Sequence, residues 1–117
     1  MKKTVVHFEI GCSDLEKTSS FYQAVFDWKM KSHGNFVAID NDEGALPGHI
    51  NKLGPNDPQN YVTIYIETDT LHADLEAIES RGGKIMVPPT ALPGNREFAW
   101  FEDVAGNIMG LITPKED

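Results

Sequence analysis

The sequence lacks several features that would assign it to a large protein class. Its single cysteine, Cys12, excludes an internal disulfide and a cysteine-based zinc cluster, so a structural role is expected for it. No apolar run reaches the length of a membrane span, and the first residues lack the apolar core of a secretory signal. We therefore expect a cytoplasmic protein that does not bind membranes.

Basic residues are also scarce. Lys and Arg number 10 against 18 Asp and Glu, which gives a formal charge of -8 that repels phosphate backbones. Because the sequence contains no local basic patch, we expect no nucleic-acid partner. With 117 residues, the chain has the length of one globular domain that can bury its own core.

The first half of the chain has the pattern of one strand, one helix and three short strands. Residues 4–10 are rich in β-branched and aromatic side chains. A helix is predicted next, because Ser13 and Glu16 match a capping box and an apolar stripe follows at helical spacing. The stripe consists of Leu15, Thr18, Tyr22, Val25 and Phe26. The helix should end near Asp27, before strands at residues 28–32, 35–40 and 48–53 that are separated by turns at 33–34 and 41–44.

The second half repeats this order after a linker at residues 54–58 that is rich in Gly and Pro. A strand is predicted at residues 61–67, and Asp69 or Thr70 can cap the helix that follows it. The buried stripe of that helix consists of Leu71, Leu75 and Ile78, and Gly82-Gly83 ends it. The remaining strands are expected at residues 84–87, 97–102 and 107–113, with Pro88-Pro89 and residues 91–96 in loops.

An offset of about 56 residues aligns the two halves, as expected of an internal repeat. It carries Phe8 to Ile64 and Leu15 to Leu71, so apolar residues map onto apolar residues. This repeat predicts an α+β fold with two tandem βαβββ modules, at about residues 4–54 and 60–114, in a single domain of residues 1–117. Neither half can hide its own sheet, so we expect a curved mixed sheet around a shared cavity.

Strand alternation assigns polar side chains to that cavity. If Val6, Phe8 and Ile10 face the first helix, then His7 and Glu9 face the cavity. The equivalent residues of the second half are Thr63, Tyr65 and Glu67. A pocket lined by such groups is the default position for a small-molecule ligand. The alternative for His7 is a hydrogen-bonded polar group in a partly hydrated cavity, whereas His33 and His72 are expected to be solvated.

Three stretches resemble the vicinal oxygen chelate superfamily, which contains glyoxalases, bleomycin-resistance proteins and extradiol dioxygenases. They are HFEIGCSDLEKTSSFYQAVFDW, YVTIYIETDTLHADLEAIESRGGKI and FEDVAGNIMGLITP. The segment containing LPGNREFAWFEDVAGN is most similar to short glyoxalase-related proteins without a settled activity. The resemblance covers nearly the whole chain and implies the same two-module fold.

In metal-dependent members, the resemblance implies one ligand from the first strand of each module and a carboxylate from the closing strand. His7 matches the first position, whereas Thr63 and Gly110 stand where such members have His and Glu. His49 could face the cavity or lie beside the ligand position. Because a stable divalent site needs three or four ligands, we expect no cofactor. A divalent metal, with His7 as a ligand, is the less favoured alternative.

The resemblance implies two classes of function. The first is a lyase or isomerase that moves a proton next to a carbonyl, with His7 and Glu67 as its acid/base pair. The second is a non-catalytic module that sequesters a small molecule, as bleomycin-resistance proteins do. A homodimer is compatible with both, because superfamily members often pair through exposed sheet edges.

Two further residues are candidates for lining the cavity. Trp100 lies in an aromatic strand and could form an apolar wall, although core packing would also explain it. Arg96 follows the loop at residues 92–95 and could bind a carboxylate, with a surface charge as the alternative.

Overall fold

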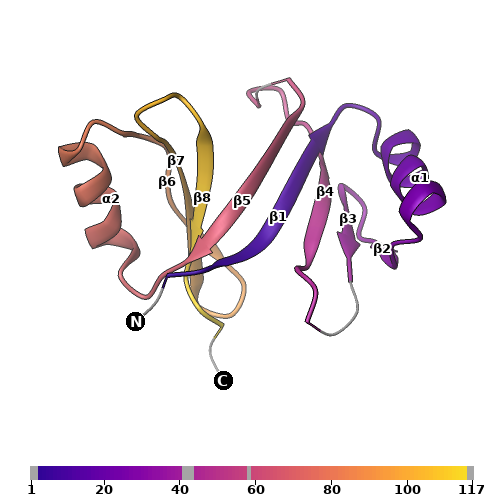
Figure 1. The fold of residues 1–117 in the computed structure, drawn as a ribbon, viewed down its shortest axis with the longest axis horizontal. Helices are drawn as coiled ribbons and strands as arrows, with labels where there is room; N and C mark the ends of the chain where they lie inside the picture. The colour runs from indigo at the N-terminus through magenta and orange to yellow at the C-terminus, as the bar shows by residue number, and fades with distance from the viewer. Residues whose placement is uncertain (1–2, 41–43, 58, 116–117) are drawn as a thin grey trace. The chain divides into compact units, whose positions relative to one another are not determined.

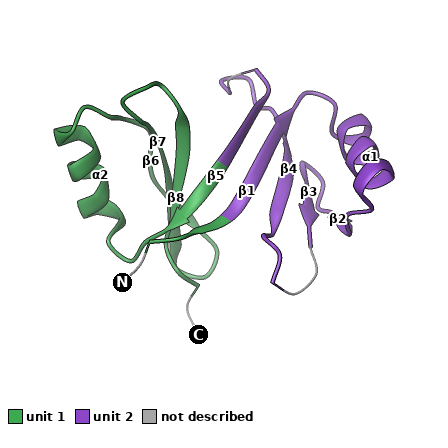
Figure 2. Ribbon diagram, viewed as in Figure 1, with its two compact units in different colours: residues 1–6, 64–117 green, residues 7–63 purple. Residues whose placement is uncertain are grey.

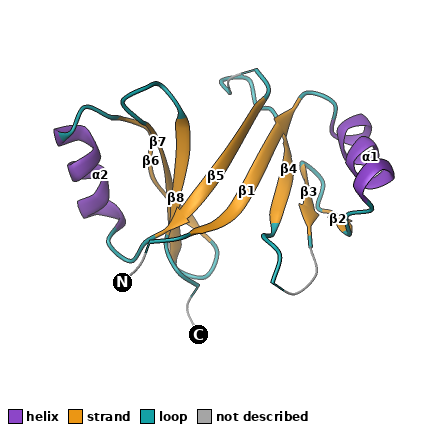
Figure 3. Cartoon of the chain, viewed as in Figure 1, coloured by secondary structure: helices purple, strands orange, loops and turns teal. Residues whose placement is uncertain are grey.

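The chain folds into two helices and eight strands in the computed structural model, which describes residues 3–40, 44–57 and 59–115 (Figure 1). The first module comprises β1 (Val5–Cys12), α1 (Leu15–Phe26), β2 (Met30–Ser32), β3 (Phe36–Ile39) and β4 (Gly48–Lys52). The second comprises β5 (Tyr61–Glu67), α2 (Leu71–Ser80), β6 (Lys84–Leu92), β7 (Arg96–Glu102) and β8 (Ile108–Ile112). The order βαβββ therefore occurs twice, and the predicted α+β class is confirmed (Figure 3).

Two compact units can be distinguished in the chain (Figure 2). Unit 2 consists of residues 7–63, and unit 1 consists of residues 1–6 and 64–117. The boundaries fall inside β1 and β5, so each of these strands contributes residues to both units. The single domain of residues 1–117 and its enclosed cavity stay predictions.

The sheet of unit 2 is mixed, with the strand order β2-β3-β4-β1. β1 runs parallel to β4, and β3 is antiparallel to both β2 and β4. One face carries the core of this unit, whose buried members are Ile10, Cys12, Val37, Ile39 and Ile50. Phe8, Leu15 and Tyr22 pack against that core, so Phe8 and Ile10 lie on the same side as α1, as predicted. Cys12 is buried, in agreement with a structural role.

Helix α1 differs from its prediction at both ends. Its N-cap is Asp14, whose side chain accepts a hydrogen bond from the backbone N–H of Lys17. The predicted capping box of Ser13 and Glu16 is therefore wrong, because the cap is one residue later and Lys17, rather than Glu16, occupies the third helical position. The helix ends as expected at Asp27, which adopts a left-handed φ of 57°.

The apolar stripe predicted for α1 is exposed in its last turn. Val25 and Phe26 are 56% and 55% exposed, and no residue of this helix is fully buried. Phe26 stacks on Trp28, with ring centroids 5.5 Å apart. The side chain therefore packs on the aromatic residue that follows the helix, which periodicity within the helix does not report.

The sheet of unit 1 has the strand order β5-β8-β7-β6. β5 is parallel to β8, and the other neighbours are antiparallel. Leu71 and Leu75 of α2 are buried, as predicted, and Ile78 packs against the same core. Its other buried members are Ala99, Phe101 and Leu111.

Strand β6 is longer than predicted. It continues from Lys84 to Leu92 through Pro88-Pro89, so the loop predicted at the two prolines is wrong. β6 is the edge strand of this sheet, so the proline that faces away from β7 costs no hydrogen bond between strands. Its pairing with β7 shifts in register between Val87 and Thr90, as at a β-bulge.

Two smaller predictions, the turn at residues 41–44 and the linker, include residues 41–43 and 58, which lie outside the described residues.

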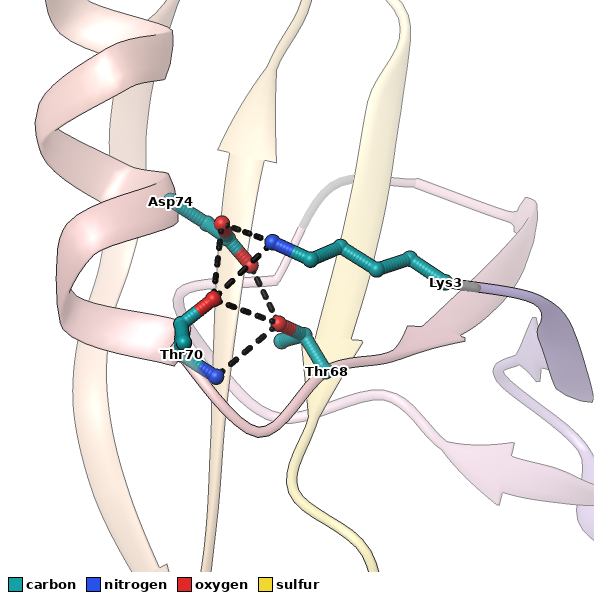
Figure 4. A network of polar contacts seen from close by, with 4 residues as sticks. All are labelled: Lys3, Thr68, Thr70 and Asp74. Atoms are coloured by element: carbon teal, nitrogen blue, oxygen red, sulfur yellow. Dashed lines mark hydrogen bonds and ion pairs between the residues drawn. The ribbon is translucent and has the colours of Figure 1, made fainter. Parts of the chain in front are cut away.

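Helix α2 begins in a network of polar side chains rather than with a simple cap (Figure 4). Thr70 is the N-cap residue but makes no side-chain cap bond to the helix. Lys3 Nζ lies 2.5 Å from Asp74 Oδ1, and the buried Thr68 hydroxyl donates to the same carboxylate. Burial raises the pKa of Asp74, but the hydrogen bonds from Lys3 and Thr68 outweigh it, so the pKa is lowered.

In the described part of the chain, no helix is long and apolar enough to cross a membrane.

Candidate active site

Five polar side chains of unit 2 form a connected group, which we call the His7 cluster. It consists of His7, Glu9, His49, Asn51 and Tyr61. His7 and Glu9 come from β1, His49 and Asn51 from β4, and Tyr61 from the start of β5. The parallel pairing of β1 and β4 places Glu9 directly opposite His49. Strand alternation explains why all of these side chains point away from the core of unit 2.

The two imidazoles and the carboxylate form a chain of hydrogen bonds. His7 Nε2 lies 2.7 Å from His49 Nδ1, and His49 Nε2 lies 3.1 Å from Glu9 Oε1. An ionised carboxylate can only accept, so we assign the proton of His49 to Nε2. His49 Nδ1 then accepts from His7 Nε2–H. A proton on His7 is therefore connected to the Glu9 carboxylate through one imidazole ring.

The second oxygen of Glu9 is bound from another strand. The Tyr61 hydroxyl donates to Glu9 Oε2, and Asn51 Nδ2 donates to Tyr61 Oη over 3.3 Å. Burial raises the pKa of Tyr61, and the hydrogen bond to Glu9 and its charge raise it further. The hydroxyl therefore keeps its proton at neutral pH and remains a donor.

Glu9 is deeply buried, with only 4% of its surface exposed. A buried carboxylate is costly unless its oxygens have partners, and here His49 binds one oxygen and Tyr61 the other. His7 and His49 are half-buried, and the Phe36 ring meets the His49 ring edge-on. The cluster thus extends from a buried anion to a partly exposed imidazole. This arrangement can accept and return a proton.

The residues of the cluster do not fit the metal site that the resemblance implies. Two nitrogen ligands of one zinc ion lie about 3.3 Å apart, given bonds of about 2.0–2.1 Å and tetrahedral angles. The 2.7 Å between His7 Nε2 and His49 Nδ1 is instead a hydrogen-bond distance. Within residues 3–40, 44–57 and 59–115, no group of three or more His, Cys, Asp or Glu side chains could hold a metal ion.

The second module differs at the equivalent positions. Tyr65 is opposite Gly110 on the parallel pair β5 and β8, as Glu9 is opposite His49 on β1 and β4. The Tyr65 ring covers Gly110 so closely that even a Cβ there would overlap it. Trp100 Nε1 donates to Tyr65 Oη at 2.7 Å, and both residues are buried. No ligand side chain fits at Gly110 without moving this ring.

The remaining candidates have separate environments. Thr63 is buried in unit 2, and Glu67 belongs to unit 1, where its backbone N–H donates to Thr4. His7 and Glu67 thus lie in different units, and their acid/base pairing stays a prediction. Arg96 Nε donates to the backbone carbonyl of Thr113 at 3.1 Å, which ties the start of β7 to the chain after β8. A carboxylate-binding role for Arg96 stays a prediction.

The two other histidines are exposed, as predicted. His72 forms a surface pair with Glu97 at 3.1 Å, and His33 stacks on Phe36.

Sequence reasoning missed Tyr61 and Asn51. The same alternation that assigned Thr63 and Tyr65 to one face extends back to Tyr61, so its position was available from the strand pattern. Asn51 is two residues after His49 in β4, so alternation from His49 places it on the same face.

Comparison with known proteins identifies relatives over most of the chain. A model of the Glyoxalase/Bleomycin resistance protein/Dioxygenase superfamily matches residues 4–110. A glyoxylase-like domain-containing protein of Didymella fabae is 29% identical over 119 residues, covering 90% of this chain and 89% of that protein. The anthracycline biosynthesis protein DnrV of Streptomyces peucetius is 26% identical over 123 residues, covering 89% of this chain but 44% of that protein.

Solved structures share the fold at low sequence identity. A hypothetical protein of Bacillus halodurans matches with a TM-score of 0.72 and 12% identity, covering 100% of this chain and 98% of that chain. Methylmalonyl-CoA epimerase of Mycobacterium tuberculosis matches with a TM-score of 0.70 and 13% identity, covering 96% and 88%. A Streptomyces coelicolor methylmalonyl-CoA epimerase in complex with 2-nitronate-propionyl-CoA matches with a TM-score of 0.63 and 17% identity, covering 96% and 97%. At these identities the likeness establishes the fold alone.

Proposed function

The chain belongs to the Glyoxalase/Bleomycin resistance protein/Dioxygenase superfamily, and we propose that it is an acid/base enzyme of this superfamily. In this proposal it is a lyase or isomerase that moves a proton next to the carbonyl group of a small molecule. The observation that carries it is the chain of hydrogen bonds from His7 through His49 to the buried Glu9. Imidazole and carboxylate side chains are the groups that most often act in general acid/base catalysis.

His7 is the proposed general base. With its Nε2–H donated to His49, neutral His7 has its lone pair on Nδ1, which would take the proton from the carbon next to the carbonyl. The electron pair of the broken C–H bond enters the carbonyl group as an enolate. Return of the proton to another position gives an isomerase, and departure of a neighbouring leaving group gives a lyase. The protonated His7 is stabilised by Glu9 through His49, as in other imidazole–carboxylate arrangements.

The charge of the chain bears on the substrate class. A formal charge of -8 disfavours binding of a polyphosphate carrier, so we propose a small neutral carbonyl compound rather than a CoA ester. Several of the matching structures are named methylmalonyl-CoA epimerase, and an epimerase is one kind of isomerase in the proposed class. The proposal includes no metal cofactor. The cytoplasmic location and the homodimer stay predictions.

Hydrogen–deuterium exchange tests the proposed chemistry without a known product. The protein is incubated in D₂O with a panel of neutral carbonyl compounds and with acyl-CoA esters, and deuterium uptake next to the carbonyl is followed by NMR. For an active compound, His7→Ala should lower the exchange rate by at least about 100-fold. His33→Ala, at the exposed turn of the same unit, is the matched control and should leave the rate unchanged.

Two outcomes would contradict the proposal. A compound that binds and is released without exchange would favour the sequestration module of the bleomycin-resistance type. Elemental analysis that finds one metal ion per chain in the wild type and none in His7→Ala would overturn the metal-free mechanism.

A further inference from the structure

We infer that Tyr61 is a positioning residue of the His7 cluster, whose hydroxyl holds the Glu9 carboxylate against His49 and so fixes the orientation of His7. This inference rests on the proposed acid/base function, because it gives Tyr61 a role in the same proton transfer. Tyr61 is outside every ligand position that the resemblance implies. It acts through Glu9 rather than on the substrate.

Both oxygens of the Glu9 carboxylate have hydrogen-bond partners. Oε1 accepts from His49 Nε2 and Oε2 accepts from Tyr61, so the carboxylate is bound on both sides. The last torsion of a glutamate side chain is broad and roughly two-fold, so a carboxylate with one partner can rotate. The second hydrogen bond restricts that rotation. Glu9 thereby presents one oxygen to His49 in a fixed direction.

Tyr61 is itself held on two sides. Its ring lies on Gly11 of β1, where any Cβ would overlap it. Asn51 Nδ2 donates to the Tyr61 oxygen, so the hydroxyl proton must point to a different acceptor, which is Glu9. β1 therefore contributes both the Glu9 acceptor and the space at Gly11, and β4 contributes the Asn51 donor. A glycine at position 11 is required for the ring to reach its place.

The surroundings of Tyr61 keep it in its donor form. Burial raises the pKa of Tyr61 most, followed by the hydrogen bond to Glu9 and the charge of Glu9, whereas the hydrogen bond from Asn51 lowers it by less. On the other side of the cluster, Phe36 separates His49 from the exposed His33. Tyr61 therefore remains a neutral hydroxyl that donates to an anion, which is the strong class of hydrogen bond.

The tautomer of His49 provides a direct test. In the wild type, ¹⁵N shifts from a long-range ¹H–¹⁵N spectrum should show His49 as a single tautomer with the proton on Nε2. Tyr61→Phe keeps the ring on Gly11 but removes the donor to Glu9, so a mixture of the two tautomers is expected. For an active compound, kcat for exchange should fall by between about 10- and 100-fold with KM unchanged, because geometry rather than binding is lost.

Matched variants separate positioning from packing. Tyr22→Phe removes the hydroxyl of another half-buried tyrosine of unit 2 and should leave the His49 tautomer and the rate unchanged. Asn51→Ala removes the donor that orients the Tyr61 hydroxyl, and it should give a smaller change in the same direction. If Tyr61→Phe does not fold, Asn51→Ala still tests the positioning role, because it disturbs the same hydroxyl.

The failure of this inference differs from the failure of the proposed function. A single His49 tautomer and an unchanged rate in both Tyr61→Phe and Asn51→Ala would overturn the positioning role while leaving His7 as the base. A tautomer mixture in Tyr61→Phe, with no exchange on any compound by the wild type, would support the positioning role and contradict the enzyme.

Discussion

The two modules carry different chemistry at equivalent strand positions. In the first module, Glu9 and His49 face each other across β1 and β4 and are joined by a hydrogen bond. In the second, Tyr65 and Gly110 occupy the corresponding positions on β5 and β8, and the tyrosine ring covers the glycine. A repeated backbone therefore does not require a repeated site. One module uses the position for ionisable groups and the other for aromatic packing.

The helices of the two modules also differ, both in how deeply they are buried and in how they begin. α2 buries Leu71 and Leu75, whereas α1 has no fully buried residue. α1 begins with a side-chain cap from Asp14, and α2 begins in the network around Asp74. Helix packing therefore contributes more to unit 1, and the site of unit 2 lies on the face of the sheet opposite to α1. The predictions below test this contrast.

The largest effect is expected from the core contacts of the helices. Leu75→Ala should lower the free energy of unfolding by about 3 kcal/mol, because it leaves a cavity under α2. Leu15→Ala in α1 should cost about 1 kcal/mol, because that side chain is only half-buried. Urea unfolding of the two variants measures both values. Equal losses would contradict the difference between the helices.

A smaller loss of stability is expected in the second module, at the glycine that the Tyr65 ring covers. Gly110→Ala should destabilise the protein by about 2 kcal/mol, because its methyl group overlaps the Tyr65 ring. In a Tyr65→Ala background the same substitution should cost little, and a double-mutant cycle would show the coupling. If Gly110→Ala is neutral in the wild type, the position is open to a side chain and the modules are more alike than we conclude.

The start of α1 should show a cap of ordinary strength. Asp14→Ala should cost about 1 kcal/mol, because the Lys17 N–H loses its acceptor. Ser13→Ala, one residue earlier, should be close to neutral, and thermal unfolding compares the two. A larger loss of stability in Ser13→Ala than in Asp14→Ala would show that Ser13 is the cap, as the sequence predicted.

The smallest effect concerns pH and the start of α2. The pKa of Asp74 is lowered in the folded protein, so its ionised form stabilises the fold above the unfolded value of about 3.9. That contribution is lost as the pH falls through the folded pKa. Asp74→Asn should therefore cost up to about 1 kcal/mol at pH 7, and the difference from wild type should disappear in strong acid. A difference that persists at pH 2 would show a packing role instead.

Much of the fold was predictable because its signals are local. Strand alternation, helical periodicity and glycine-rich turns lie within a few residues of one another, so the order βαβββ and the shared face of His7 and Glu9 could be read directly. Errors arose where contacts outside the element decide. Phe26 packs on Trp28, which follows the helix, and Pro88-Pro89 is tolerated in an edge strand whose register with β7 shifts at these residues.

The candidate site was predictable only in part. His7 and Glu9 follow from one strand, but their link through His49 depends on the register between β1 and β4, which are far apart in the chain. Tyr61 joins through a third strand, and Asn51 through its bond to Tyr61. The sequence alone determined the two modules and the polar face of the first strand, since both depend on spacing along the chain. Tertiary structure alone decided which donor meets which acceptor, because hydrogen bonds require contact between strands that the chain brings together only on folding.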